Sequence, residues 1–308
     1  MAVSADHVQV VGAHPALDKA LDKAKAYVAL TKPRIIELLL VTTVPTMVLA
    51  ARGLPSGWLI LETLVGGTLA AGGANAINMY VDRDIDALMH RTAKRPLVTG
   101  ALTPSSALVF AIGLEVAAFV ELTLLVNLLS AILAVSATLF YVFVYTLWLK
   151  RTSTQNIVIG GAAGAVPVLV GWTAVRDSLS LAPVLLFLVI FVWTPPHFWA
   201  LAIRYRDDYA AADVPMLPAV VPLRATGRRI VAYTVVLWAT SLLFGAAASV
   251  GVIYWTAAVV LGGVFLFGAL QLYHDPTEAR AMRLFGWSIT YLTLLFAAIA
   301  VDQLVRHV

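Results

Sequence analysis

The chain has 308 residues, of which 61% are hydrophobic and 12% are charged, and its formal net charge is +4. Soluble domains carry about 25% charged residues, so this chain has too few charges to cover the surface of a soluble protein. It contains no cysteine, which excludes disulfides, thiolate metal sites and cysteine nucleophiles. The composition predicts an all-α integral membrane protein. In such a protein the placement of positive charge reports orientation, so no nucleic-acid partner is expected.

The first 26 residues form a polar N-terminal segment ahead of a predicted membrane domain over residues 27–308. This segment lacks the basic start and the following apolar stretch of a signal peptide, and it carries acidic residues where that stretch should be. Residues 16–30 predict a short amphipathic helix with three lysines, which lies in solvent or on the membrane surface.

Nine apolar runs approach or reach the length of about 20 residues that a transmembrane helix needs. They cover residues 35–51, 58–80, 105–125, 128–149, 157–174, 181–201, 230–250, 251–270 and 284–304. Residues 202–229 form the longest polar stretch and are expected to be a loop. Of the 21 Lys and Arg residues, only Arg52, Arg176 and Arg306 fall on one side of this nine-helix bundle. The positive-inside rule therefore places the N-terminus in the cytoplasm and the C-terminus outside.

The second predicted helix ends at the cytoplasmic face in NAINMYVDRDIDALMHRTAKRP, residues 75–96. Asn78, Asp82 and Asp86 are four residues apart and project from nearly one face of a helix, whereas Asp84 points to another side. Mg²⁺ takes a few carboxylates and completes its shell with water and substrate phosphates. This spacing therefore predicts a Mg²⁺ site for a diphosphate. The alternative is a solvated loop whose charges pair among themselves.

Basic residues follow the acidic ones directly. Arg91, Lys94 and Arg95 could bind the phosphate oxygens that a metal leaves free, because charge-assisted hydrogen bonds to phosphate are strong. His90, in the same stretch, is expected to be exposed.

The sixth predicted helix ends at the same face, in RYRDDYAAADVPMLP. Asp208 and Tyr209 are candidates for a second wall of one cleft. The alternative is that Asp207 or Asp208 merely pairs with Arg204 or Arg206.

Upstream in this helix, the stretch TPPHFW places His197 directly after two prolines. Pro195 and Pro196 are expected to break the helix and free backbone carbonyls. His197 could then point into a cavity as a haem contact, or it could hydrogen-bond to the freed carbonyls. Glu115 lies within a predicted span and has no partner that the sequence identifies.

Five stretches together resemble the UbiA superfamily of intramembrane prenyltransferases, and in finer detail its branch that farnesylates protohaem IX. The stretches are LTKPRI at 30–35, NMYVDRDIDALMHRTAKRPLVTG at 78–100, YTLWLKRTSTQNIVIGGAAGAVPVLVGW at 145–172, WTPPHFWALAIRYRDDYAAADVPMLP at 193–218 and LFGWSITYLTLLFAAIAVD at 284–302. The resemblance covers nearly the whole chain from about residue 27.

The resemblance implies a set of site residues. Those implied for the metal are Asn78, Asp82 and Asp86. Those implied for catalysis on the diphosphate are the same three with Asp208, Arg91 and Arg95. Those implied for substrate binding are Lys32, Arg34, Lys94, Lys150, Arg151, His197, Tyr209, Trp193 and Tyr145. The chain departs from many superfamily members in lacking a second Asp-x3-Asp, because Ala211 and Ala212 stand four residues after Asp207 and Asp208.

The implied reaction transfers a farnesyl group from farnesyl diphosphate to a vinyl group of haem B, adds water and gives haem O for terminal oxidases. Mg²⁺ is the implied cofactor, and haem is a substrate. The allylic cation formed needs a water-poor pocket with aromatic walls. Candidates are Trp172, Trp193, Phe198, Trp199 and Tyr145, although interfacial aromatic belts would also explain such residues.

The implied setting is a bacterial plasma membrane, with the active site facing the cytoplasm, lipid around the bundle and a haem A synthase as a downstream partner. Two alternatives stay open. One is a UbiA-type enzyme that prenylates an aromatic acid for quinone synthesis, which would share the first acidic motif. The other is a membrane transporter, which usually carries charge at mid-membrane.

Overall fold

The computed structural model describes residues 15–307, without the side chains of residues 15–17, 34, 35 and 37–40. The described residues form helices and no strand. Much of the predicted N-terminal polar segment, residues 1–14, lies outside this range, so the boundary at residue 27 stays a prediction.

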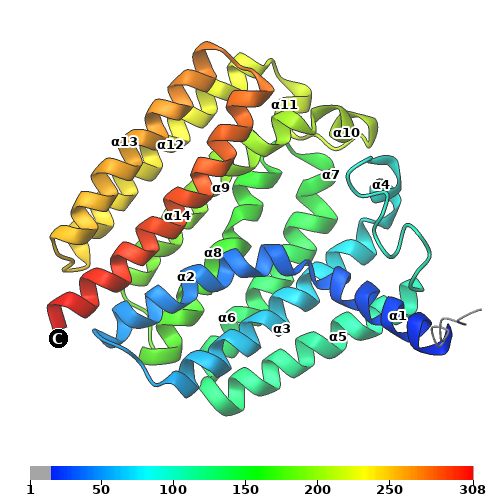
Figure 1. The fold of residues 1–308 in the computed structure, drawn as a ribbon, viewed down its shortest axis with the longest axis horizontal. Coiled ribbons are helices and arrows are strands. Elements are labelled where there is room, and N and C mark those ends of the chain that lie inside the picture. The colour runs from blue at the N-terminus through cyan, green and yellow to red at the C-terminus, as the bar shows by residue number, and fades with distance from the viewer. Residues whose placement is uncertain (1–14, 308) are drawn as a thin grey trace, which may run out of the picture.

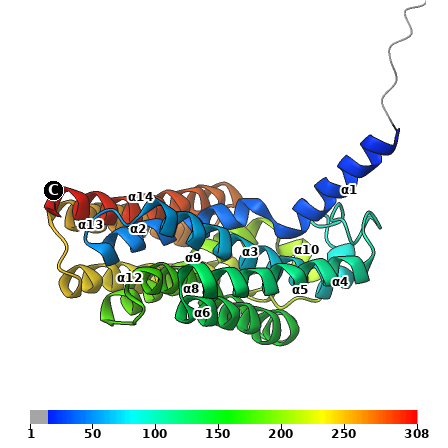
Figure 2. The same ribbon diagram turned by 90° about the horizontal axis from the view of Figure 1, so that it is seen from below.

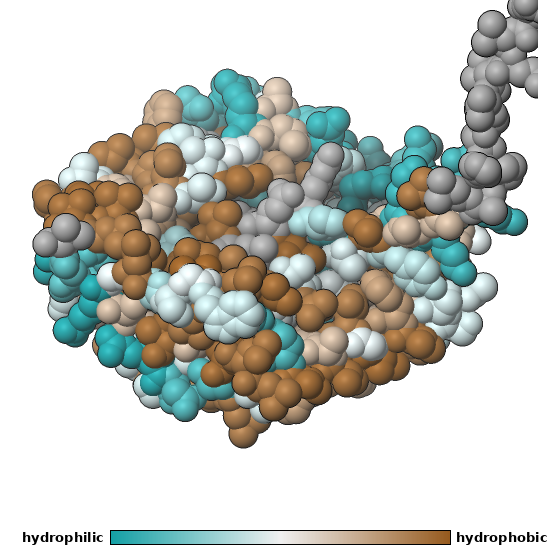
Figure 3. All heavy atoms as spheres, turned by 60° about the horizontal axis from the view of Figure 1, so that its bottom comes forward, coloured by the Kyte–Doolittle hydropathy of each residue, from teal (hydrophilic) through white to brown (hydrophobic). Residues whose placement is uncertain are grey.

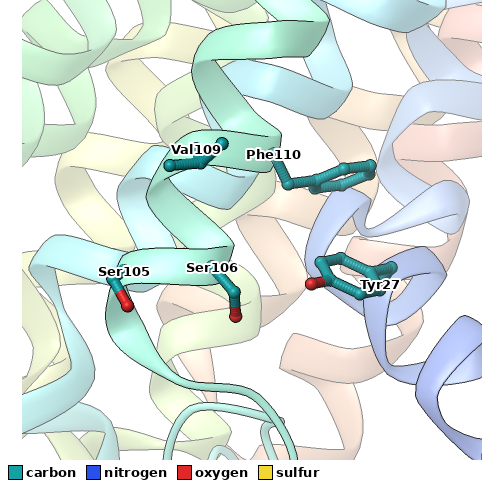
Figure 4. Close-up of a pocket in the computed structure, with 5 residues that line it drawn as sticks. All are labelled: Tyr27, Ser105, Ser106, Val109 and Phe110. Atoms are coloured by element: carbon teal, nitrogen blue, oxygen red, sulfur yellow. The ribbon is translucent and has the colours of Figure 1, made fainter.

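The first helix, α1 (Pro15–Thr31), agrees with the amphipathic helix predicted at 16–30. It projects away from the helical bundle (Figure 2). Its C-terminal end is attached by apolar contacts, since Leu30 is fully buried and the Tyr27 ring lies 4.9 Å from that of Phe110. A shallow hollow of about 400 Å³ lies beside this contact, and Figure 4 shows Tyr27 facing its other lining residues on α5.

The longer helices follow the predicted apolar runs. They are α2 (Pro33–Ala51), α3 (Gly57–Val81), α5 (Pro104–Glu121) continued by η1 (Leu122–Val126), α6 (Leu128–Leu139) continued by η2 (Phe140–Leu149) and α7 (Lys150–Thr152), α8 (Asn156–Arg176), α9 (Leu181–Arg204), α12 (Leu223–Ala247), α13 (Val252–His274) and α14 (Glu278–His307). Within the described range, eight of these segments are long and apolar enough to cross a membrane. The remaining predicted span is α2, whose qualifying apolar part, Val41–Ala51, is shorter.

The expected loop at 202–229 is mostly helical. It contains α10 (Arg206–Ala211), α11 (Leu217–Val220) and the first turns of α12. The prediction was wrong here because it relied on apolar runs, and Arg224, Arg228 and Arg229 make the start of α12 polar. For the same reason α14 begins at Glu278 rather than at residue 284.

Helix α9 lies at the centre of one half of the bundle. It packs against α8, α12 and α14, and Figure 1 shows α14 crossing it with α12 and α13 side by side behind. The glycine-rich run at 160–167 brings α8 close to its neighbours. A Cβ at Gly160 would overlap the Tyr145 ring, and one at Gly161 would come 2.9 Å from the Thr194 side chain.

The outer surface of the bundle is apolar over most of its length. Val109 and Leu124 on the span formed by α5 and η1, and Phe267 on α13, are each more than half exposed. Hydrophobic side chains cover much of the face in Figure 3. A surface of this kind is stable against lipid rather than water, so the chain is a multi-pass membrane protein.

Short helices gather at one end of the bundle. They are α4 (Arg83–Leu88), α7 and α10, and Figure 1 shows them near one another beyond the ends of α3, η2 and α9. Two of the three therefore follow helices whose ends carry the predicted acidic stretches.

Candidate active site

The four-residue spacing of Asn78, Asp82 and Asp86 continues across a bend between α3 and α4. Helix α3 ends at Val81, Asp82 has φ −83° and ψ 2°, and α4 continues the chain. Backbone hydrogen bonds join Asp82 N–H to Asn78 C=O at 2.9 Å and Asp86 N–H to Asp82 C=O at 2.8 Å. The three polar side chains are all buried, with at most 3% exposure.

Asp82 is the centre of this cluster. One carboxylate oxygen, Oδ2, forms an ion pair with Lys150 and accepts a hydrogen bond from Asn78 Nδ2 at 2.8 Å. The other, Oδ1, is buried without a hydrogen-bond partner, and the Arg151 guanidinium lies 3.9 Å away. A buried carboxylate oxygen without a hydrogen bond is costly. It is therefore a candidate position for a cation.

Asp86 is fixed by its own loop. Its Oδ2 accepts a hydrogen bond from Arg95 Nη1 at 2.5 Å. The Thr92 hydroxyl donates to the Asp86 carbonyl at 2.8 Å. This hydrogen bond joins the two ends of the segment 86–92. Two of the basic residues expected to bind phosphate, Lys150 and Arg95, thus lie directly on the two buried carboxylates.

Asp84 is separated from the other two aspartates. Its side chain is 60% exposed, and both its oxygens accept hydrogen bonds from Arg151 at 2.7 Å. These bonds lower the pKa of Asp84 to about 2. Arg151 also donates to the Val81 carbonyl at 3.2 Å, so this pair fastens α7 to the bend between α3 and α4.

Lys32 enters the cluster from the junction of α1 and α2. Its backbone is left-handed, with φ 52° and ψ 62°, directly before Pro33. Its Nζ donates to Asn78 Oδ1 at 2.7 Å. Burial, followed by the positive charges of Arg95 and Lys150, lowers the pKa of Lys32 to about 7.

The second acidic stretch meets the first. Asp208 Oδ2 accepts a hydrogen bond from the backbone N–H of Arg91 at 3.1 Å. The Arg91 guanidinium lies over the rings of Tyr205 and Tyr209, with its carbon 5.4 and 5.9 Å from their centroids. Burial raises the pKa of the Tyr209 hydroxyl, to which Arg91 Nη2 donates at 3.5 Å.

The alternative interpretation, local pairing within this stretch, holds for Asp207 but not for Asp208. Asp207 pairs with Arg206 at 3.4 Å, whereas Arg204 pairs with Glu278 at 3.4 Å. Asp208 instead joins the two loops through its bond to Arg91, and its place in the wall of a cleft stays a prediction.

A π-helical segment, η2, lines the cluster with the predicted Tyr145 and with Tyr141 and Thr146, which the sequence did not reveal. The Thr146 hydroxyl donates to the Tyr141 carbonyl, five residues back, at 2.8 Å and accepts from Asn78 Nδ2 at 3.1 Å. The Tyr141 ring stacks on that of Tyr145 at 5.3 Å. π-Helical segments are frequent at functional sites, but their position cannot be predicted from a pattern of residues.

The helix break expected at Pro195 and Pro196 does not occur, because α9 runs continuously through both residues. The prolines still leave the carbonyls of residues 191 and 192 without a helical N–H, but within residues 15–307 His197 makes no hydrogen bond to them. Its Nδ1 lies 2.7 Å from the Ser288 hydroxyl, and its ring stacks on Trp193 at 4.2 Å. Glu115, within the span of α5, has a partner that the sequence did not identify, since the Thr138 hydroxyl donates to its Oε1 at 3.2 Å.

The remaining aromatic candidates are dispersed. Trp199 is buried against Tyr233, Phe198 is 36% exposed, and Trp172 is half-buried. Interfacial or packing roles fit Trp199 and Phe198 better than a place in one aromatic wall.

Three further residues that the sequence singled out make none of these contacts within the described part of the chain. Lys94 and His90 are exposed, and neither forms an ion pair within residues 15–307. Arg34 lies in α2, but its side chain is outside the described part of the structure. Across that part, no three His, Cys, Asp or Glu side chains gather as a metal site. The predicted metal set therefore consists of two carboxylates and an amide.

Comparisons with known proteins agree with this architecture. The model of the UbiA prenyltransferase family matches residues 39–298. A protein named protoheme IX farnesyltransferase from Clavibacter michiganensis subsp. michiganensis is 55% identical over 92% of this chain and 93% of its own. One of the same name from Parafrankia sp. is 56% identical over 94% of this chain and 93% of its own.

The fold is also similar to a solved structure of a UbiA homologue from Archaeoglobus fulgidus bound to DMAPP and Mg²⁺. That comparison has a TM-score of 0.64 and 15% identity, and it covers 89% of this chain and 99% of the other. Family match, sequence identity and fold agree over most of the length. The chain belongs to the UbiA prenyltransferase family.

Proposed function

We propose that this chain transfers the farnesyl group of farnesyl diphosphate to a vinyl group of haem B, with addition of water. The relatives named protoheme IX farnesyltransferase, 55% and 56% identical over almost the whole chain, support this substrate pair. The observation that carries the chemistry is the buried Asp82 carboxylate, which has one oxygen without a hydrogen bond and lies among Lys150, Arg151 and Asn78.

Mg²⁺ fits this donor set. Asp82 Oδ1 is buried and free of hydrogen bonds, and Asp86 and Asn78 supply further oxygen donors in the same register. A hard cation takes such oxygen donors and leaves other positions to water and phosphate. When bound, Mg²⁺ would neutralise charge on the departing diphosphate. The Mg²⁺-bound archaeal homologue supports this assignment.

The basic residues act on the same diphosphate. Lys150 and Arg95 form ion pairs with Asp82 and Asp86, and Lys32 donates a hydrogen bond to the amide oxygen of Asn78. When the diphosphate binds, these cations can hydrogen-bond to its oxygens as well. Arg91, held over the rings of Tyr205 and Tyr209, would bind the diphosphate together with Arg151 and Lys94. Arg34 is assigned to the same role from its position in the sequence.

The farnesyl chain belongs in the apolar part of the bundle. Each buried CH₂ group contributes about 0.8 kcal/mol, so the tail partitions into the membrane while the diphosphate stays at the charged end. Breaking the C1–O bond leaves an allylic cation. The vinyl π-electrons attack it, and water then adds to the new cation beside the macrocycle and loses a proton, which the released diphosphate can accept. The stacked Tyr141 and Tyr145 rings present aromatic faces next to the cluster, where they stabilise positive charge.

The proposed topology in the membrane follows from the same assignment of helices. We propose nine spans with α2 as the first, a cytoplasmic N-terminus and an active site that faces the cytoplasm of a bacterium. The concentration of basic residues at the end of the bundle that carries α4, α7 and α10 supports this orientation. A haem A synthase would use the product.

One incubation tests the function. Purified protein with haem B, farnesyl diphosphate and Mg²⁺ is expected to yield a haem adduct heavier by one farnesyl group and one hydroxyl group, detected by mass spectrometry. A parallel incubation with 4-hydroxybenzoate tests the quinone-pathway alternative. Prenylation of that acid alone would overturn the proposal.

Replacing Asp208 by Ala is expected to lower turnover about tenfold. A hydrogen bond to a charged group is worth about 1.5–3 kcal/mol, and here its loss frees the Arg91 loop from α10. The measurement is the initial rate of haem adduct formation. The matched control is Asp207→Ala, since that side chain is 94% exposed. Equal rates in both variants would show that the link between the loops has no role in turnover.

A further inference from the structure

His197 lies in an apolar stack that leaves only one of its ring nitrogens with a partner. The imidazole is enclosed between the rings of Trp193 and Phe285, at centroid distances of 4.2 and 4.7 Å and interplanar angles of 18° and 28°. The Phe198 ring meets it edge-on at 5.4 Å. Within residues 15–307, His197 forms no ion pair. A charged imidazole would be costly in this environment, so the ring is neutral.

Ser288 selects the tautomer of this neutral ring. Its hydroxyl donates its single proton to the Phe285 carbonyl at 2.6 Å. The same oxygen lies 2.7 Å from His197 Nδ1, and since the carbonyl is the nearer of the two acceptors for the hydroxyl proton, we assign the imidazole proton to Nδ1. The Ser288 carbonyl also accepts from Trp193 Nε1 at 2.9 Å, so one turn of α14 orients both the imidazole and the ring stacked on it.

The lone pair of His197 is then on Nε2. This atom makes no hydrogen bond within the described residues, and the side chain keeps 7% exposure at the edge of the stack. A neutral imidazole whose other N–H is held by a fixed acceptor is the arrangement found in metal-ligating histidines. The proposed substrate, haem B, contains an iron ion that such a histidine can bind.

We propose that His197 Nε2 is an axial ligand of the substrate haem iron, and that Ser288 is the positioning residue that sets its tautomer and direction. The inference rests on the proposed function for the identity of the ligand. It assigns α9 and α14 to the haem subsite, while α3, α4 and η2 hold the diphosphate. Coordination would fix the macrocycle before the farnesyl group arrives, because the iron–nitrogen bond is directional.

The test compares haem B with metal-free protoporphyrin IX, using the purified full-length protein and absorbance titrations. Wild-type protein is expected to give the spectrum of nitrogen-ligated haem. Ser288→Ala should weaken haem binding about 10–100-fold, as loss of an outer partner of a ligand usually does. His197→Gln should weaken it at least as much and should remove the nitrogen-ligated spectrum. Binding of metal-free protoporphyrin should change little in either variant.

Controls separate ligation from packing. Ser288→Thr keeps the hydroxyl and is expected to restore haem binding, and His274→Gln replaces an exposed histidine at the end of α13. Equal weakening of haem and metal-free protoporphyrin by His197→Gln would show a packing role and overturn the inference. So would an unchanged haem spectrum in that variant. Farnesyl transfer is measured separately, so active wild-type protein without nitrogen-ligated haem refutes only the ligand assignment. Ligated haem with no farnesyl transfer refutes only the proposed function.

Discussion

Asp82→Asn is expected to lower farnesyl transfer by at least about 100-fold, because an amide oxygen cannot supply the negative charge that a metal-bound diphosphate site requires. The Asp82 side chain is fully buried, and its Oδ1 has no hydrogen-bond partner. Asp86→Asn should have a comparable effect, since it removes the second buried carboxylate. Turnover is measured over a Mg²⁺ titration, and extra Mg²⁺ should restore little activity.

The same loop provides the matched control. Asp84→Asn makes an identical chemical change two residues away, at a side chain that is 60% exposed and paired with Arg151. Exposed pairs contribute about 0–1 kcal/mol, so this variant should stay stable and active. Near-normal activity in both Asp82→Asn and Asp86→Asn would refute the metal-site assignment.

Lys150→Met is expected to destabilise the metal-free protein by about 3–5 kcal/mol, the usual cost of removing one partner from a buried ion pair. Lys150 is 12% exposed in this pair, and Asp82 is fully buried. The variant should also become dependent on Mg²⁺ for stability, because the metal would then be the main cation available to Asp82. The melting temperature should therefore rise more with Mg²⁺ in this variant than in the wild type.

Two comparisons complete the Lys150 experiment. Lys23→Met, at an exposed position on α1, controls for loss of a lysine. The double variant Asp82→Asn/Lys150→Met removes both charges and should recover stability without recovering turnover or the Mg²⁺ response. If Mg²⁺ raised the melting temperature equally in wild type and Lys150→Met, Lys150 and the metal would not share Asp82.

The sequence predicted the long helices well because their signals are local. Apolar runs separated by Gly, Pro or charged residues located α3, α8 and α9 to within a few residues. The prediction was wrong where a helix start was polar, as in α12, and where two prolines were taken as a break. Proline inside a span is tolerated when neighbouring helices supply packing and hydrogen bonds.

The site could be predicted only in part. The four-residue register identified the buried pair Asp82 and Asp86 and separated them from Asp84, although the roles of these residues stay predictions. The register could not reveal that Lys150 neutralises Asp82, nor that Thr146 contacts Asn78, because these pairs are 68 residues apart. Ser288 was missed for the same reason, since it lies 91 residues from His197. A single sequence carries no signal for such pairings.

The link between Arg91 and Asp208 has a consequence for how the protein is made. The two residues are 117 positions apart, whereas Asp82 and Lys150 are 68 apart and Lys32 and Asn78 are 46 apart. During synthesis the acidic stretch therefore leaves the ribosome well before Lys150, and its loop stays unlatched until α9 and α10 follow. The nascent chain therefore contains Arg95 and Lys150, the partners of Asp86 and Asp82, before it contains Asp208, the partner of the Arg91 loop. A chain stalled on the ribosome before residue 208 would thus have cations for both buried carboxylates but no link between the Arg91 loop and α10.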